Sequence, residues 1–166
     1  SVCTALLPDL LCSFYAQYPK VKIIIKSGTT QELMEMAKSN EIDLVFTLDR
    51  KICHAEWCGA VQKKERILFV APAGQISDRK AEVPTRELVT KAFLLTESGA
   101  AYQYELERLL SERDLEILPV LEIGNTETII HLLQKGMGYS FLPEFTVKKE
   151  LKREQLLEVR TDSRLW

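Results

Sequence analysis

Residues 120–143 read VLEIGNTETIIHLLQKGMGYSFLP, and this stretch decides the fold class. The segments 120–123 and 139–142 are short runs rich in apolar and aromatic residues, which are typical of strands. Between them, Asn125-Thr126 can cap a helix whose apolar residues recur at helical spacing, and Gly136 fits the left-handed position that follows a helix. The stretch therefore predicts a strand–helix–strand unit.

The same alternation continues outward from this unit in both directions. Thr29 and Glu32 form the T-x-x-E pattern of a capping box, and Pro143 opens a last helix. Strands that alternate with helices favour parallel sheets with helices on both faces. The expected strands are 21–26, 42–47, 66–71, 92–96, 120–123, 139–142 and 156–159, and the main expected helices are 5–18, 29–38, 101–113 and 126–135.

Composition limits the possible functions of the chain. Its 166 residues are 46% hydrophobic and 28% charged, which is ordinary for a globular protein. The net charge is -2 and there is no long basic run, so we expect no positively charged surface for binding nucleic acid within these residues. There is no run of 18 apolar residues, and the first residues, SVCT, show no export leader, so we expect a cytoplasmic protein whose four cysteines are free thiols.

Candidate ligand-binding residues lie where strands lead into helices. In open α/β sheets, ligands bind beyond the carboxyl ends of the strands, where helix N-termini offer free N–H groups. Four such junctions, at 2–4, 27–30, 97–100 and 124–126, carry small hydroxyl, amide or glycine residues that together can hold a carboxylate or a phosphate. The alternative is that Thr29, Ser98, Asn125 and Thr126 only cap helices. Glu97 is either an acceptor for an amino group of the ligand or an exposed charge.

Enzyme and metal signatures are missing. We find no H-E-x-x-H, G-x-S-x-G or G-x-x-x-x-G-K-[ST] motif, so we expect neither an enzyme nor a cofactor. His131 lies in the middle of an expected helix, where packing or surface exposure is its expected role. Cys53, His54 and Cys58 are close in sequence, but their spacing is loose and no second ligand pair follows, so we expect no metal. A Cys53–Cys58 disulfide and a redox role for Cys3 remain alternatives.

Several motifs, in order, resemble the effector-binding domains of LysR-type bacterial transcriptional regulators. They are TALLP at 4–8 with YPKV at 18–21, SGTTQEL at 27–33, EIDLV at 41–45, IGNTE at 123–127, GMGY at 136–139 and FLP at 141–143. No single motif is specific, but their order and spacing extend over essentially the whole chain. At the junction near residue 100, the family often has small hydroxyl residues where this chain has Ala100-Ala101.

The resemblance implies an α/β, two-lobed type 2 periplasmic-binding-protein-like fold, with two mixed, mostly parallel sheets joined by two crossover strands. Lobe I is expected at 1–71 and 144–166, and lobe II at 72–143. A small anionic or amino-acid-like effector is expected in the cleft between them, and a winged helix-turn-helix that binds DNA is expected upstream in the full protein. The expected effector-binding residues are Cys3, Thr4, Thr29, Thr30, Glu97, Ser98, Gly99, Ala101, Asn125 and Thr126.

Apolar surface beyond what one lobe needs predicts a homodimer. The helix at 5–18 is apolar over more than one stripe, and the run Ile23-Ile24-Ile25 is apolar on both faces of a strand. The resemblance implies that these elements pair with a late helix and strand of a second subunit, with a tetramer possible in the full protein. Intramolecular packing of the same residues is the alternative. The expected interface residues are Leu7, Leu11, Tyr15, Ile23, Ile25, Ile130 and Gln134.

Two rival functions share this fold. A solute-binding protein of an ABC-type transporter would be exported, and the absence of a leader and the expected free thiols count against it. An enzyme on this fold, such as a dehydratase, would need a convergent acid, base or nucleophile, and the sequence shows none.

Overall fold

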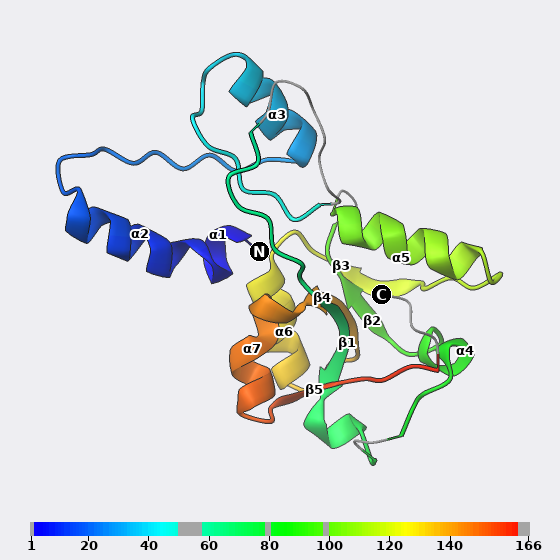
Figure 1. Ribbon diagram of the computed structural model, residues 1–166. Coiled ribbons are helices and arrows are strands. Elements are labelled where there is room, and N and C mark those ends of the chain that lie inside the picture. Colours follow the sequence, from blue (N-terminus) through cyan, green and yellow to red (C-terminus); the bar gives the residue numbers. More distant parts are fainter. Residues whose placement is uncertain (1, 50–57, 79–80, 98–99, 163–166) are drawn as a thin grey trace. The chain divides into compact units, whose positions relative to one another are not determined.

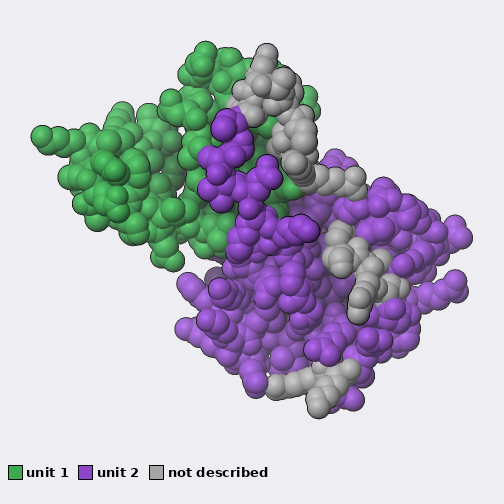
Figure 2. Space-filling model, viewed as in Figure 1, with its two compact units in different colours: residues 1–52 green, residues 53–166 purple. Residues whose placement is uncertain are grey.

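The computed structural model describes residues 2–49, 58–78, 81–97 and 100–162 (Figure 1). The chain divides into two compact units, Ser1–Ile52 and Cys53–Trp166, which are coloured separately in Figure 2. We describe each unit by itself. None of the helices found in the described ranges is both long enough and apolar enough to cross a membrane.

Unit 1 consists of helices and extended chain. Its helices are α1 (Val2–Ala5), α2 (Leu7–Gln17) and α3 (Thr30–Lys38). Pro8 stands in the first turn of α2, where its missing N–H costs no hydrogen bond. The expected helix at 5–18 is confirmed over α2, although a turn at Leu6 separates it from α1.

The two strands expected in unit 1 are not formed. Segments 21–26 and 42–47 carry no strand in the described chain, and most of their large apolar side chains are exposed. A β-branched run becomes a strand only when a neighbouring backbone accepts and donates its hydrogen bonds, and no such ladder is present in unit 1. An ion pair of 3.1 Å between Lys26 Nζ and Glu41 Oε2 links the ends of these two regions.

Unit 2 contains a three-stranded and a two-stranded sheet. Its strands are β1 (Ile67–Pro72), β2 (Phe93–Leu95), β3 (Pro119–Glu122), β4 (Ser140–Pro143) and β5 (Leu156–Glu158). The parallel pairing that the alternation predicts is found between β2 and β3, whereas β4, β1 and β5 form an antiparallel sheet in that order. A parallel bridge between Phe93 and Tyr139 places the start of β4 beside β2.

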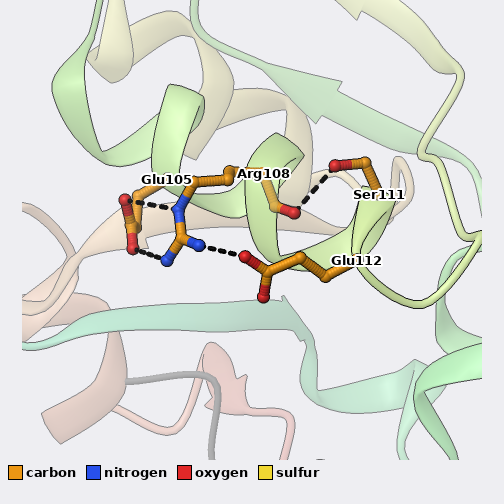
Figure 3. Close-up of polar contacts among 4 residues, drawn as sticks. All are labelled: Glu105, Arg108, Ser111 and Glu112. Carbon is orange, nitrogen blue, oxygen red and sulfur yellow. Dashed lines mark hydrogen bonds and ion pairs between the residues drawn. The ribbon is translucent and has the colours of Figure 1, made fainter.

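Helices lie on both sides of the strands of unit 2. They are α4 (Thr85–Leu88), α5 (Ala101–Ser111), α6 (Thr126–Gln134) and α7 (Glu144–Lys152), and a short 3-10 helix, η1 (Ala73–Gln75), follows β1. Figure 1 shows α4 and α5 on one side of the strands and α6 and α7 on the other. On its exposed face, α5 carries ion pairs from Arg108 to Glu105 and to Glu112, while Ser111 Oγ donates to the Arg108 carbonyl (Figure 3).

Alternation along the strands divides the buried side chains into two clusters. Phe69 and Ala71 of β1 face one way and Leu68 and Val70 face the other, as the period of two requires. The first cluster contains Phe69, Ala71, Leu88, Phe93, Leu95, Leu106, Leu110, Phe141 and Val159. The second contains Leu68, Val70, Leu94, Ile129, Ile130, Leu133, Leu142, Val147 and Leu156. Burial of these apolar side chains is the main force that holds α4–α7 on the sheet.

The turn from α6 to β4 depends on two glycines. Gly136 has φ of +89°, which confirms the left-handed position expected after this helix. Gly138 has φ of +68°, and any Cβ there would overlap the carbonyl of Ala92. That carbonyl accepts the N–H of Tyr139 at 2.8 Å, so Gly138 lets β4 start directly against β2.

Candidate functional site

In unit 1, the two candidate junctions lie next to each other. Cys3 Sγ of α1 lies 3.7 Å from Ser27 Oγ, which immediately precedes the loop into α3. Cys3 and Thr4 are exposed, and Thr30 is the first residue of α3. The structure therefore brings the first and second expected junctions together at the N-terminal end of α3.

Thr29 forms the expected capping box with Glu32. The Thr29 hydroxyl accepts the Glu32 N–H at 3.3 Å and donates to Glu32 Oε2 at 2.9 Å, while the Thr29 N–H donates to the same oxygen at 2.7 Å. These bonds, with the backbone one first, lower the pKa of Glu32 below its ordinary value. The capping role of Thr29 is confirmed, and its role in effector binding stays a prediction.

In unit 2, the third and fourth junctions also meet. The Ile123 N–H donates to the Leu95 carbonyl at 3.1 Å, so β2 and β3 end side by side. Directly beyond them, the Glu97 carboxylate lies against Gly124, and a Cβ at Gly124 would be 3.0 Å from Glu97 Oε2. Glu97 is exposed, whereas Thr126 is buried at the start of α6.

Two helices start at this pair of strand ends, and they differ in their caps. Asn125 Oδ1 accepts the Thr128 N–H at 3.1 Å, which confirms Asn125 as the cap of α6. Ala100 provides no side-chain cap for α5, and the first turn of α5, which begins at Ala101, has no acidic residue. Among the described residues, no side-chain oxygen caps the N-terminus of α5, and the Ala100 carbonyl accepts the N–H of Gln103 at 2.9 Å. Ser98 and Gly99 lie outside the described residues.

A buried polar network fixes the start of α5, and the sequence analysis missed it. The Thr96 hydroxyl donates to Gln103 Oε1 at 3.0 Å, and the Tyr102 hydroxyl lies 3.2 Å from the same Thr96 oxygen. Thr96 and Gln103 are both buried, and Gln103 Nε2 reaches Glu107 Oε1 at 3.5 Å. Burial raises the pKa of Tyr102 above its ordinary value of 10.0, and the hydrogen bond with Thr96 opposes this only in part.

The remaining chemical candidates are the cysteines and the two histidines. Cys3, Cys12 and Cys58 are free and exposed, and no group of three His, Cys, Asp or Glu side chains suits a metal ion in the part of the chain that the structure describes. Cys53 and His54 lie outside the described residues. The free thiol of Cys58 speaks against the alternative of a Cys53–Cys58 disulfide. His131 is exposed on α6, as its expected surface role requires.

The residues expected at the dimer interface differ in how far they are exposed. Tyr15, Ile23 and Ile25 are exposed, Leu11 is half-buried, and Leu7 is buried. In unit 2, Ile130 belongs to the core and is 8% exposed, while the exposed Gln134 donates to Gln155 Oε1 at 3.1 Å. The sequence analysis missed the exposed Tyr104 of α5, with Leu118 and Val120 at β3. The alternation of 118, 120 and 122 in sequence is the signal that identifies this outward face.

Comparison with known proteins gives the family. The family described as "LysR substrate binding domain" matches this chain over residues 1–165. The chain is 28% identical over 151 residues to the HTH-type transcriptional regulator CbbR of Sinorhizobium medicae, covering 90% of this chain and 48% of CbbR. It is 30% identical over 169 residues to the uncharacterized HTH-type transcriptional regulator YwqM of Bacillus subtilis, covering 98% of this chain and 56% of YwqM. The chain thus spans about half the length of these relatives.

Solved structures confirm the fold. The regulatory domain of CcmR from Synechocystis, in complex with 2-PG, matches with a TM-score of 0.70 at 22% identity, over 94% of this chain and 74% of that one. The bromide-bound regulatory domain of HypT from Salmonella typhimurium matches with a TM-score of 0.72 at 16% identity, over 95% of this chain and 75% of that one. The expected periplasmic-binding-protein-like α/β fold is therefore confirmed. Because the family match extends over residues 1–165, this chain belongs to the LysR substrate binding domain family.

Proposed function

We propose that the chain is the effector-sensing domain of a LysR-type bacterial transcriptional regulator. The observation that carries this proposal is the family match over residues 1–165. The effector is a small anionic or amino-acid-like metabolite, and it binds in a cleft between lobe I (1–71 and 144–166) and lobe II (72–143). CcmR in complex with 2-PG and the bromide-bound HypT domain support a site for a small ligand on this fold.

The strand-end junctions supply the proposed binding groups. In unit 1, the contact between Cys3 and Ser27 gathers one set of hydroxyl, thiol and amide groups at the start of α3. In unit 2, Glu97 against Gly124 gathers a second set at the starts of α5 and α6. Effector contacts are assigned to the described residues Cys3, Thr4, Thr29, Thr30, Glu97, Ala101, Asn125 and Thr126, and to Ser98 and Gly99.

Regulation follows from differential affinity. An effector that binds one arrangement of the lobes more tightly than another shifts the population toward that arrangement. The domain forms a homodimer, with a tetramer possible in the full-length protein. The change in lobe arrangement is transmitted through this assembly to a winged helix-turn-helix elsewhere in the full-length protein, and only that part contacts DNA. The names of the relatives as HTH-type transcriptional regulators support the DNA-binding part of this proposal. The full protein acts in the cytoplasm.

The relatives also favour a regulator over the two rival functions. Those compared above are transcriptional regulators rather than transport proteins or enzymes. Within the described residues, the carboxylates and cysteines at the junctions are not joined to a histidine or lysine by any hydrogen bond, so no nucleophile–base pair supports catalysis. The ligand is therefore bound and released unchanged.

A thermal-shift screen of small metabolites tests this function. A ligand at 100 to 1,000 times its Kd stabilises the folded state by about 2.7 to 4.1 kcal/mol. We expect at least one carboxylate or amino acid to raise the unfolding temperature and to be recovered unchanged after incubation. A screen without any stabilising ligand, or a hit that the chain converts to a product, would contradict the proposed function.

A further inference from the structure

A hollow of about 290 Å³ lies in unit 2 between α5 and β3. One wall is a single face of α5, which contributes side chains at helical spacing, and the other wall is the chain from Leu115 to Glu122. The apolar side chains that line the hollow are Leu95, Leu106, Leu110, Leu115, Ile117 and Pro119. The hollow therefore offers an apolar surface to a group that comes from outside the unit.

Three glutamates, Glu107, Glu116 and Glu122, also line this hollow, and we call the whole the acidic groove. All three are exposed, and within the described residues no basic side chain forms an ion pair with them. Glu107 accepts a hydrogen bond of 3.5 Å from Gln103 Nε2. The nearby Arg108 is already paired on the exposed face of α5 (Figure 3). The negative charge of the groove is therefore not compensated by a cation of unit 2.

Four cations lie together at the C-terminal end of α7. They are exposed, their spacing places them on one face of the helix, and we call them the basic face: Lys148, Lys149, Lys152 and Arg153. In the described ranges none of the four forms an ion pair. Val147 of α7 packs in the second buried cluster, whereas Leu106 of α5 packs in the first, on the opposite side of the strands (Figure 1). The basic face and the acidic groove of one copy therefore cannot neutralise each other.

We propose that the acidic groove of one copy binds the basic face of a second copy. A lysine side chain suits this groove, because its methylene stem can cover the apolar lining while its ammonium reaches a carboxylate. Segment 101–122 carries six acidic and two basic residues, whereas segment 144–153 carries four basic and two acidic residues, so the two surfaces attract each other. The two surfaces differ, so copies associate head to tail. This contact goes beyond the proposed function, since it needs neither effector nor DNA.

The test is sedimentation of the whole chain, at high protein concentration and at about 0.02 M and 0.5 M salt. The groove variant carries Glu116→Lys with Glu122→Lys, and the helix variant carries Lys149→Glu with Lys152→Glu. The matched control carries Asp43→Lys with Glu82→Lys. It changes the net charge as the groove variant does, at exposed residues that neither line the groove nor belong to α7.

We expect the wild type and the control to form larger species at low salt, and high salt to weaken this association about tenfold or more, because exposed charges are screened. The groove variant alone and the helix variant alone should not associate, since like charges then face each other. An equimolar mixture of the two variants should associate again, because each reversed surface meets its opposite. The substituted side chains are exposed, so the unfolding temperatures should stay close to that of the wild type.

Three results would overturn the inference. The first is a wild type without salt-sensitive association, the second is a charge-reversed variant that associates alone as the wild type does, and the third is a mixture that stays apart. If the wild type does not associate but oligolysine binds it and not the groove variant, the groove serves a different basic partner and the second copy is rejected. A homodimer formed by apolar residues of unit 1 is not weakened by salt, so the salt dependence separates the two contacts.

Discussion

The hydroxyl of Thr96 donates a 3.0 Å hydrogen bond to Oε1 of Gln103, and both side chains are buried. This bond joins the end of β2 to the first turns of α5, on either side of the proposed effector-binding segment. Because Gln103 Oε1 is buried, water cannot easily take the place of the Thr96 hydroxyl as its hydrogen-bond donor. The bond therefore holds the start of α5 against the sheet.

Thr96→Val removes this donor while it keeps the shape of the side chain. Gln103 Oε1 then remains buried without Thr96, and we expect the free energy of unfolding to fall by about 1 to 3 kcal/mol. Thr90→Val is the control, because the Thr90 hydroxyl donates to the Glu87 carbonyl in an exposed turn. Urea unfolding measures both variants, and equal losses would show that the buried network has no special role.

Because Tyr102 is largely buried, we expect the folded state to lose stability at high pH. Burial raises its pKa above 10.0, so in the unfolded chain Tyr102 ionises at a lower pH than in the folded chain. The contribution of Tyr102 to the free energy of unfolding is therefore complete below about pH 10. It is lost as the pH rises through and beyond that value. We expect the difference in stability between the wild type and Tyr102→Phe to shrink from about pH 10 upward. Parallel curves across this range would contradict the assignment.

The two glycines after α6 give a matched pair of substitutions. Gly136→Ala places a side chain at φ of +89° but meets no neighbouring atom within 4 Å. Gly138→Ala has φ of +68° and also drives its methyl group into the Ala92 carbonyl. We expect about 1 kcal/mol of destabilisation for Gly136→Ala and a clearly larger loss for Gly138→Ala, because the strand contact at Tyr139 must open. Thermal unfolding measures both, and the reverse order would refute the packing described at β2 and β4.

Thr29→Val separates the capping role of Thr29 from its proposed binding role. Loss of the cap should cost about 1 kcal/mol of stability. If the hydroxyl also contacts the effector, as we propose, affinity should fall by a further 1 to 2 kcal/mol, about the value of one buried hydrogen bond. Thr29→Ser retains the hydroxyl and is the control. Calorimetry that finds unchanged affinity in Thr29→Val would leave Thr29 as a helix cap only.

The exposed apolar residues of unit 1 predict a homodimer. Ile23 and Ile25 are exposed, and a two-fold pairing would bury about 1,200 to 2,000 Å² in total. Sedimentation at micromolar concentration should therefore show a species of twice 19.0 kDa, which Ile25→Glu should split. A single species of 19.0 kDa in the wild type would contradict the dimer for this chain.

Local features of this structure were predictable, because their causes lie within a few residues of one another. The capping box at Thr29, the cap at Asn125 and the left-handed Gly136 each depend on one turn of chain, and each is confirmed. The strand–helix–strand unit of β3, α6 and β4 follows from the same local rules together with apolar spacing.

Features that depend on distant partners were not predictable. The run at 21–26 has strand-forming residues but no paired neighbour in unit 1, so propensity alone misleads there. The residues that pair with β1 are 70 or more positions away in the sequence, and alternation along the chain does not fix the direction of their strands. In the site, the convergence of Glu97 with Gly124 depends on the register of β2 and β3, which no single motif contains.

Hydrogen exchange on the wild-type chain, with and without the ligand found in the metabolite screen, tests the central claim most directly. A small molecule held at the strand-end junctions should slow amide exchange most at 27–30, at the N-terminal turn of α5 and at 124–126, and little along α7. This is the result that the proposed effector site predicts. Protection that appears on α7 or at the η1 loop, with the junction amides exchanging as they do without ligand, would contradict it.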